Sequence, residues 1–113
     1  MILIPLLIGA ALVGIAVFWK ELISWMQRAI NKVKQIISGA LEGAKTFIVK
    51  MTDGIKNIAK YYSKNQLTNE YEETVTKKVV NENDVPEELR NRISMHINVE
   101  VDTTVELLGK LSA

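Results

Sequence analysis

Residues 1–19 read MILIPLLIGAALVGIAVFW and contain no charged side chain. A helix rises about 1.5 Å per residue, so a helix of this length approaches the ~30 Å hydrocarbon core of a bilayer. The stretch therefore predicts a transmembrane helix. A cleaved secretory signal and a buried core helix are the alternatives. The stretch lacks the basic start of a signal peptide, and the polar remainder of the chain is poorly suited to cover an apolar core helix.

The charges after this stretch predict its orientation. Basic residues dominate the segment that follows residue 19, whereas none precedes it. The positive-inside rule then places the N-terminus outside and the C-terminal body in the cytoplasm of a single-pass membrane protein, as in a bacterial inner membrane. The residues expected at the membrane interface are Trp19, Lys20, Trp25 and Arg28.

Residues 20–64 predict one long basic amphipathic helix, either continuous or bent. Apolar residues recur every three or four positions from Leu22 to Tyr62, which is the helical period. The segment carries nine basic and three acidic side chains. Its wide apolar stripe suits a helix that touches two neighbours, as in a bundle or a ring of subunits. The same stripe and charge also suit a helix that lies on anionic lipid.

Small residues in both segments predict close packing between helices. Ala10 and Gly14 lie four residues apart, and Gly39 and Gly43 repeat this spacing further along. A break in the long helix at the second pair is the alternative. The residues expected to pack between subunits are Ala10, Gly14, Ile30, Val33, Ile37, Gly39, Leu41, Gly43, Phe47 and Ile48.

Residues 65–113 change in composition and predict a small acidic α+β module. They carry ten acidic and five basic side chains. Residues 71–80 (YEETVTKKVV) are rich in β-forming residues and predict a strand with Tyr71, Val75 and Val79 on one face.

The rest of this module predicts a helix and a second strand. Asp84 suits the N-cap of a helix that runs to about Ser94, and residues 96–102 alternate between apolar and polar as a strand does. Residues 103–111 fit either a short helix or more sheet. Because so small a sheet leaves its edges open, we expect its strands to pair with strands of neighbouring subunits. The residues expected in that intersubunit strand are Ile97, Val99 and Val101.

These segments together predict a mostly α membrane protein in three parts. The parts are a transmembrane anchor (1–19), a basic amphipathic helix (20–64) and an acidic α+β module (65–113). Because the last two parts have opposite net charge, they favour pairing between copies of the chain.

No motif in the sequence predicts catalysis, a cofactor or a metal site. The chain has no cysteine and a single histidine, His96, and it lacks a phosphate-binding glycine motif. The adjacent pairs Glu72–Glu73 and Glu87–Glu88 are expected to be solvated surface. The lysines near Tyr61 and Tyr62 belong to no recognised nucleic-acid module, so no nucleic-acid partner is expected.

Three functions are compatible with these features. The first is a non-enzymatic single-span membrane protein that assembles into a homo-oligomer with a cytoplasmic body. The second is a pore-forming or membrane-disrupting effector, such as a toxin or a component of bacterial defence. The third is a membrane-anchored accessory subunit. The expected partners are further copies of the chain, a bilayer of anionic lipid and a cytoplasmic protein.

Overall fold

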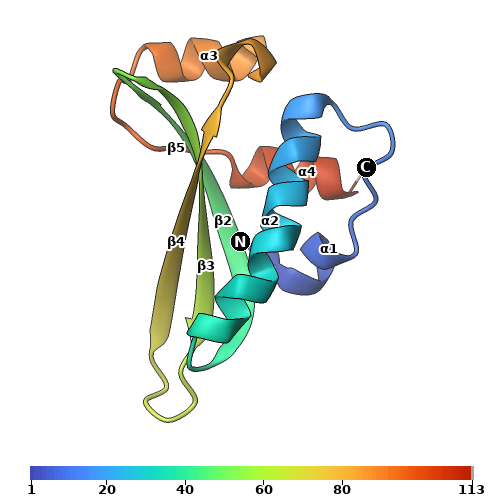
Figure 1. The fold of residues 1–113 in the computed structure, drawn as a ribbon, viewed down its shortest axis with the longest axis vertical. Helices are drawn as coiled ribbons and strands as arrows, with labels where there is room; N and C mark the ends of the chain where they lie inside the picture. Colours follow the sequence, from blue (N-terminus) through green and yellow to red (C-terminus); the bar gives the residue numbers. More distant parts are fainter. Residues whose placement is uncertain (113) are drawn as a thin grey trace.

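An antiparallel sheet of five strands organises the α+β fold of residues 1–112, which are the residues described by this computed structural model (Figure 1). The elements in chain order are β1 (Ile2–Leu3), α1 (Ile4–Ile8), α2 (Val17–Ile36), β2 (Ala40–Met51), β3 (Gly54–Lys64), β4 (Tyr71–Val80), the 3₁₀-helix η1 (Glu82–Asp84), α3 (Glu87–Ser94), β5 (Val101–Asp102) and α4 (Thr104–Ser112).

The long strands β2, β3 and β4 follow one another as two hairpins. β2 and β3 are joined by Thr52 and Asp53, and Gly54 follows with a φ of 146°. A two-residue loop of this kind needs a residue without a Cβ penalty at positive φ, which glycine supplies. β4 then pairs with β3 along its whole length, from Tyr71 opposite Lys64 to Val80 opposite Ile55.

Helix α2 packs against the sheet and supplies much of the core (Figure 1). Its buried residues recur at helical spacing, so they form one stripe along the helix. This stripe consists of Phe18, Trp19, Leu22, Ile23, Met26, Ile30 and Val33. The same core includes Ala44, Ile48, Ala59 and Tyr61 from the sheet, Leu89 and Ile93 from α3, and Leu107 from α4.

The predicted transmembrane helix is wrong. Residues 1–19 form β1, α1, an irregular connection and the first residues of α2, and Gly14 in the connection has a φ of 76°. Among residues 1–112, no helix combines the length and the apolar character needed to cross a bilayer. The apolar side chains Ile2, Ile4 and Leu7 instead complete the protein's own core.

The predicted fold class and localisation depended on that transmembrane helix, so they are wrong as well. The chain is a small α+β protein with an antiparallel sheet, and not a mostly α membrane protein. The single-pass topology, with the N-terminus outside and the body in the cytoplasm, had no other basis than the predicted span. The physical reason for the error is that an apolar segment gains a similar free energy when it leaves water for lipid and when it leaves water for a protein core.

The predicted long helix over residues 20–64 is also wrong. α2 ends at Ile36, and the residues after it form the β2–β3 hairpin. The apolar residues of this hairpin fit a three-to-four spacing, but they also fit alternation between two faces of a sheet. The β-branched and aromatic residues of β2 and β3 and the Asp53–Gly54 turn favour strands.

Two of the elements predicted for the C-terminal part, over residues 65–113, are confirmed. The strand over residues 71–80 is confirmed as β4. The helix ending at Ser94 is confirmed as α3, but its N-cap is Pro86 and not Asp84. The strand predicted over residues 96–102 shortens to the two residues of β5. The tail, for which helix and sheet were both open, forms α4.

Candidate protein-interaction edge

Strand β4 lies at the end of the sheet. It pairs with β3 on one side, and among the described residues no strand pairs with its other side. This open edge runs from Tyr71 to Val80 and contains no proline. Alternate residues of an unpaired edge direct their backbone N–H and C=O groups away from the sheet, where they can pair with another strand.

The opposite edge of the sheet is closed by the chain itself. On β2, β1 pairs beside Gly43 and Ala44, and β5 pairs beside Phe47 and Ile48. The backbone carbonyl of Lys50 accepts a hydrogen bond from the N–H of Asn98 (2.8 Å). β2 is therefore shielded along much of its length, whereas β4 is not.

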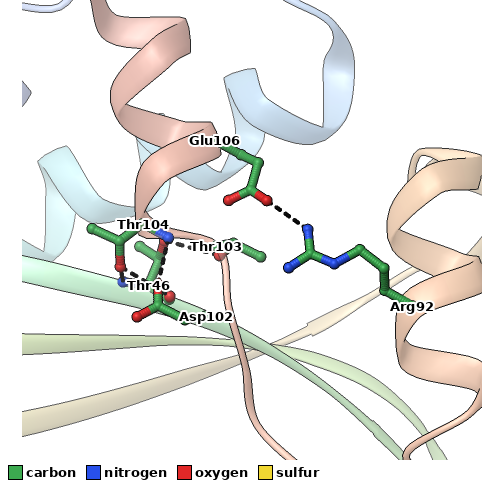
Figure 2. A network of polar contacts seen from close by, with 6 residues as sticks. All are labelled: Thr46, Arg92, Asp102, Thr103, Thr104 and Glu106. Atoms are coloured by element: carbon green, nitrogen blue, oxygen red, sulfur yellow. Dashed lines mark hydrogen bonds and ion pairs between the residues drawn. The ribbon is translucent and has the colours of Figure 1, made fainter.

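Figure 2 shows a cluster of threonines at Thr46, which lies on β2 between the residues that pair with β1 and those that pair with β5. The backbone N–H of Thr46 donates to the Thr104 hydroxyl (3.1 Å), and the Thr46 carbonyl accepts from the N–H of Thr103 (2.9 Å). The hydroxyls of Thr46 and Thr103 lie 3.0 Å apart. The Asp102 carboxylate accepts from the N–H of Thr104 (2.8 Å), two residues further on, and so forms an Asx turn at the start of α4.

One face of β4 exposes apolar side chains. Tyr71 is 61% exposed, Val75 is 44% exposed and Val79 is 70% exposed. The sequence predicted these three residues on one face, and the structure confirms it. The ammonium group of Lys64 lies 5.6 Å from the centre of the Tyr71 ring, within the range of a cation–π contact.

The charges of β4 are divided between its two halves. Its first half carries Glu72 and Glu73, and its second half carries Lys77 and Lys78. Glu72 accepts hydrogen bonds from the Ser38 hydroxyl (2.7 Å) and from the Asn65 amide (3.2 Å). Within residues 1–112, no carboxylate lies at ion-pair distance from either lysine.

Glu73 influences a neighbouring tyrosine on β3. Tyr62 stands directly opposite Glu73 in the β3–β4 pairing. Burial, together with the hydrogen bond and the negative charge of Glu73, raises the pKa of the Tyr62 hydroxyl to about 12. Tyr62 is therefore a neutral hydrogen-bond donor at neutral pH.

A groove of about 490 Å³ runs between α2 and the middle of β4. Its walls combine apolar and basic residues of α2 with residues of β4. The lining includes Trp25, Arg28, Lys32 and Ile36 of α2 and Thr74, Val75 and Thr76 of β4.

The residues predicted to pack between subunits are scattered in the structure. Ile30, Val33 and Ile48 are buried in the core, and Ile37, Leu41 and Ala10 are partly buried around it. Phe47 lies on β2 with the Lys60 ammonium 4.5 Å from its ring centre. Gly14 is exposed in the connection before α2. Gly39 and Gly43 do allow a close approach, but to the chain's own backbone, because a Cβ would lie 1.8 Å from the Lys64 carbonyl oxygen and 2.8 Å from that of Ile2.

The residues predicted at a membrane interface all belong to α2. Trp19 is buried and contacts Phe18 edge to face, with 4.9 Å between ring centroids. Trp25 is partly buried, and Lys20 and Arg28 are exposed. Trp19 therefore belongs to the protein core and not to an aromatic belt.

The residues predicted in an intersubunit strand fall mostly outside regular structure. Ile97 and Val99 are exposed in the connection between α3 and β5, and Val101 pairs with Ile48 within the chain. The open strand edge is instead that of β4. The signal in the sequence that points to this edge is the division of acidic and basic residues about Val75, of which only the pair Glu72–Glu73 is expected from the sequence to be solvated surface.

The described residues contain no grouping of three or more His, Cys, Asp or Glu side chains arranged to hold a metal ion. A scan against models of protein families, a search of curated proteins and a search of solved structures found no match to this chain.

Proposed function

We propose that this protein is a non-enzymatic interaction protein that binds an extended polypeptide strand along the open edge of β4. The observation that carries the proposal is the length of this edge, with ten residues and no proline, compared with two residues each for β1 and β5. Main-chain hydrogen bonds supply affinity in strand addition, and alternate side chains supply specificity.

Two further features of β4 support strand addition. Proteins ordinarily protect an edge with short strands, proline, bulges, charged side chains or a covering segment. Among the described residues, β4 is long, has no proline or bulge and is not covered, so charged side chains are its one protective device, and it also exposes Tyr71, Val75 and Val79. The groove beside β4 also offers apolar surface next to the edge.

The test is a selection of peptides that bind the full chain. A displayed library of random ten-residue peptides is selected on wild-type protein. The protein is kept at low concentration so that the edge of β4 is not occupied by other copies of the chain. We expect enriched peptides with β-branched and aromatic residues at alternate positions. These peptides should slow hydrogen exchange at the outward-facing amides of β4.

Proline variants provide the control for this selection. Successive residues of a strand direct their N–H groups to opposite sides, so one of Thr74→Pro and Val75→Pro loses only an outward-facing N–H. The variant that has lost only the outward-facing N–H should keep the wild-type circular dichroism spectrum, and so be folded, but it should no longer bind the peptides. The proposal is wrong if no peptide binds, or if the bound peptides are indifferent to the proline.

The predicted pore-forming effector depends on a transmembrane helix, and no helix within residues 1–112 is long and apolar enough to span a bilayer. Binding of anionic lipid and the absence of nucleic-acid binding stay predictions. Self-association, which the sequence favoured first, stays a prediction as well.

A further inference from the structure

We propose that the strand bound along β4 is the β4 strand of a second copy of this chain, antiparallel, with Val75 opposite Val75. This inference rests on the strand-binding function proposed above and names its partner. It comes from the order of side chains in YEETVTKKVV (residues 71–80), which is symmetric about Val75 once each acid is matched with a base.

In this register, each residue faces the one at equal distance on the other side of Val75. Opposite charges, threonine pairs, and aromatic residues opposite β-branched ones all stabilise antiparallel strands when they stand directly opposite each other. Because a two-fold axis relates the copies, each pair forms twice. The resulting pairs are Glu73–Lys77, Glu72–Lys78, Thr74–Thr76 and Tyr71–Val79.

Other registers lose these pairs. A shift by two residues places Glu73 opposite Val75 or Val79 and leaves Lys77 without its carboxylate. A shift by one residue brings side chains of opposite faces together. A parallel arrangement in register sets the acidic half of one strand against the acidic half of the other. The charge order therefore selects one direction and one register.

In the described monomer, the two lysines of β4 lack an acidic partner, whereas Glu72, Glu73 and Thr76 already form hydrogen bonds within the chain. Lys77 and Lys78 have no carboxylate at ion-pair distance, and Tyr71 and Val79 are the most exposed apolar residues of β4. Thr74 and Thr76 line the groove with α2. The pairing keeps the α2 side of both sheets on one side, so the two grooves open beside each other across the axis.

The first measurement is the molar mass of the full chain in solution, by sedimentation or light scattering over a range of concentrations. We expect a reversible dimer of about 25 kDa, twice the 12.7 kDa of one chain. A chain that stays monomeric at every concentration overturns the inference. If such a monomer still binds selected peptides along β4, the proposed function stands. If it binds neither itself nor peptides, both fail.

Charge variants then test which residues face each other. Glu72→Lys with Glu73→Lys makes the edge wholly basic, and Lys77→Glu with Lys78→Glu makes it wholly acidic. Each variant alone places like charges opposite each other, so its dimer should weaken by roughly tenfold or more. An equal mixture of the two variants restores every opposite pair and should form a heterodimer.

Controls separate pairing from general charge effects. Arg90→Glu changes an exposed charge on α3 and should leave the dimer unchanged. Circular dichroism confirms that each variant is folded. If the mixture associates no better than either variant alone, the Val75 register is wrong.

Disulfide formation tests the register independently. Cysteine pairs bridge when their Cα atoms lie about 4.4–6.8 Å apart, as residues directly opposite in antiparallel strands do. Val75→Cys should therefore give a covalent dimer under mild oxidation. Val79→Cys should not, because Val79 faces Tyr71. Crosslinking at residue 79 and not at residue 75 overturns the register.

Discussion

Two glycines at the start of β2 allow the chain to fold back on itself. A Cβ on Gly39 would lie 1.8 Å from the carbonyl oxygen of Lys64, and a Cβ on Gly43 would lie 2.6 Å from the Met1 side chain. The clash at Gly39 is with backbone, which cannot move aside without disturbing the end of β3. At the scale of single residues, the lack of a side chain at Gly39 and Gly43 therefore lets the beginning of the β2 segment lie close to the end of β3 and to the N-terminal residues.

Gly39→Ala should lower the free energy of unfolding by about 1–3 kcal/mol, the usual cost of forcing extra atoms into a packed site. The matched control is Gly109→Ala in α4, where an added Cβ meets nothing within 4 Å. This variant should gain about 0.5–1 kcal/mol because alanine favours a helix over glycine. Urea denaturation measures both, and equal effects at the two positions would contradict the argument.

Two adjacent tyrosines of β3 predict how stability depends on alkaline pH. Burial raises the pKa of Tyr61 to about 12, and burial with the Glu73 hydrogen bond does the same for Tyr62. Both values lie above the ordinary 10.0, so the stability from the neutral tyrosines is fully present below pH 10. It is lost as pH rises from 10 through about 12.

The urea midpoint should therefore fall as pH rises from 10 toward about 12, while absorbance at 295 nm shows delayed tyrosine ionisation. Tyr61→Phe with Tyr62→Phe should reduce this fall. A smaller fall should persist, because the hydrogen bond to Glu100 raises the pKa of Lys60 in the same pH range. A midpoint that is constant across this range would refute the assignment.

At the scale of elements, α2 and the open strand β4 have opposite roles. α2 buries one stripe against the sheet and so ties the fold together. β4 pairs on one side only, and its outer face stays exposed. The core therefore depends on the inward stripe of α2, whereas the interaction depends on the edge of β4.

Ile23→Ala tests the contribution of the α2 stripe. Ile23 is fully buried, so removing its side chain should cost about 2–5 kcal/mol of stability. Ile36→Ala makes the same change at the end of the helix, where the side chain is 73% exposed, and should stay within about 0.5 kcal/mol. Both are compared at the lowest workable concentration. A large effect at Ile36 would mean that this residue is covered in solution.

At the scale of the whole molecule, distant parts of the chain share one core. Ile2 and Leu7 from the N-terminal segment pack in the same cluster as Ile93 from α3 and Leu107 from α4. The basic and acidic parts of the chain are therefore joined in one folded unit, and the apolar start of the sequence is part of it.

Deletion of residues 1–16 should abolish cooperative unfolding. The deletion removes Ile2, Ile4 and Leu7, all at most 4% exposed. Their combined loss, at about 2–5 kcal/mol each, is comparable with the whole stability of a domain of about 5–15 kcal/mol. Val13→Ser is the control, because Val13 is 93% exposed. A truncated chain with the wild-type spectrum and midpoint would show that this segment is dispensable.

Local patterns determined the parts of the fold that depend on neighbours in the sequence. The β-forming run of β4, the faces of Tyr71, Val75 and Val79, and the end of α3 at Ser94 could all be predicted, because alternation and helix spacing act over a few residues. The charge order on which the proposed pairing rests is also present in the sequence alone.

Tertiary structure decided the conformation of the N-terminal segment and of residues 40–64, and it decided which strand forms the open edge of the sheet. An apolar segment such as residues 1–19 gains nearly the same free energy in lipid and in a protein core, so its own composition does not choose between them. Residues 40–64 fit two periodicities, and only pairing between β2 and β3 selects the strand. The edge of β4 likewise stays open because β1, β5 and the threonine cluster all lie beside β2, and no described strand pairs with the outer side of β4. Contacts between residues far apart in the chain set these outcomes, and no local pattern encodes them.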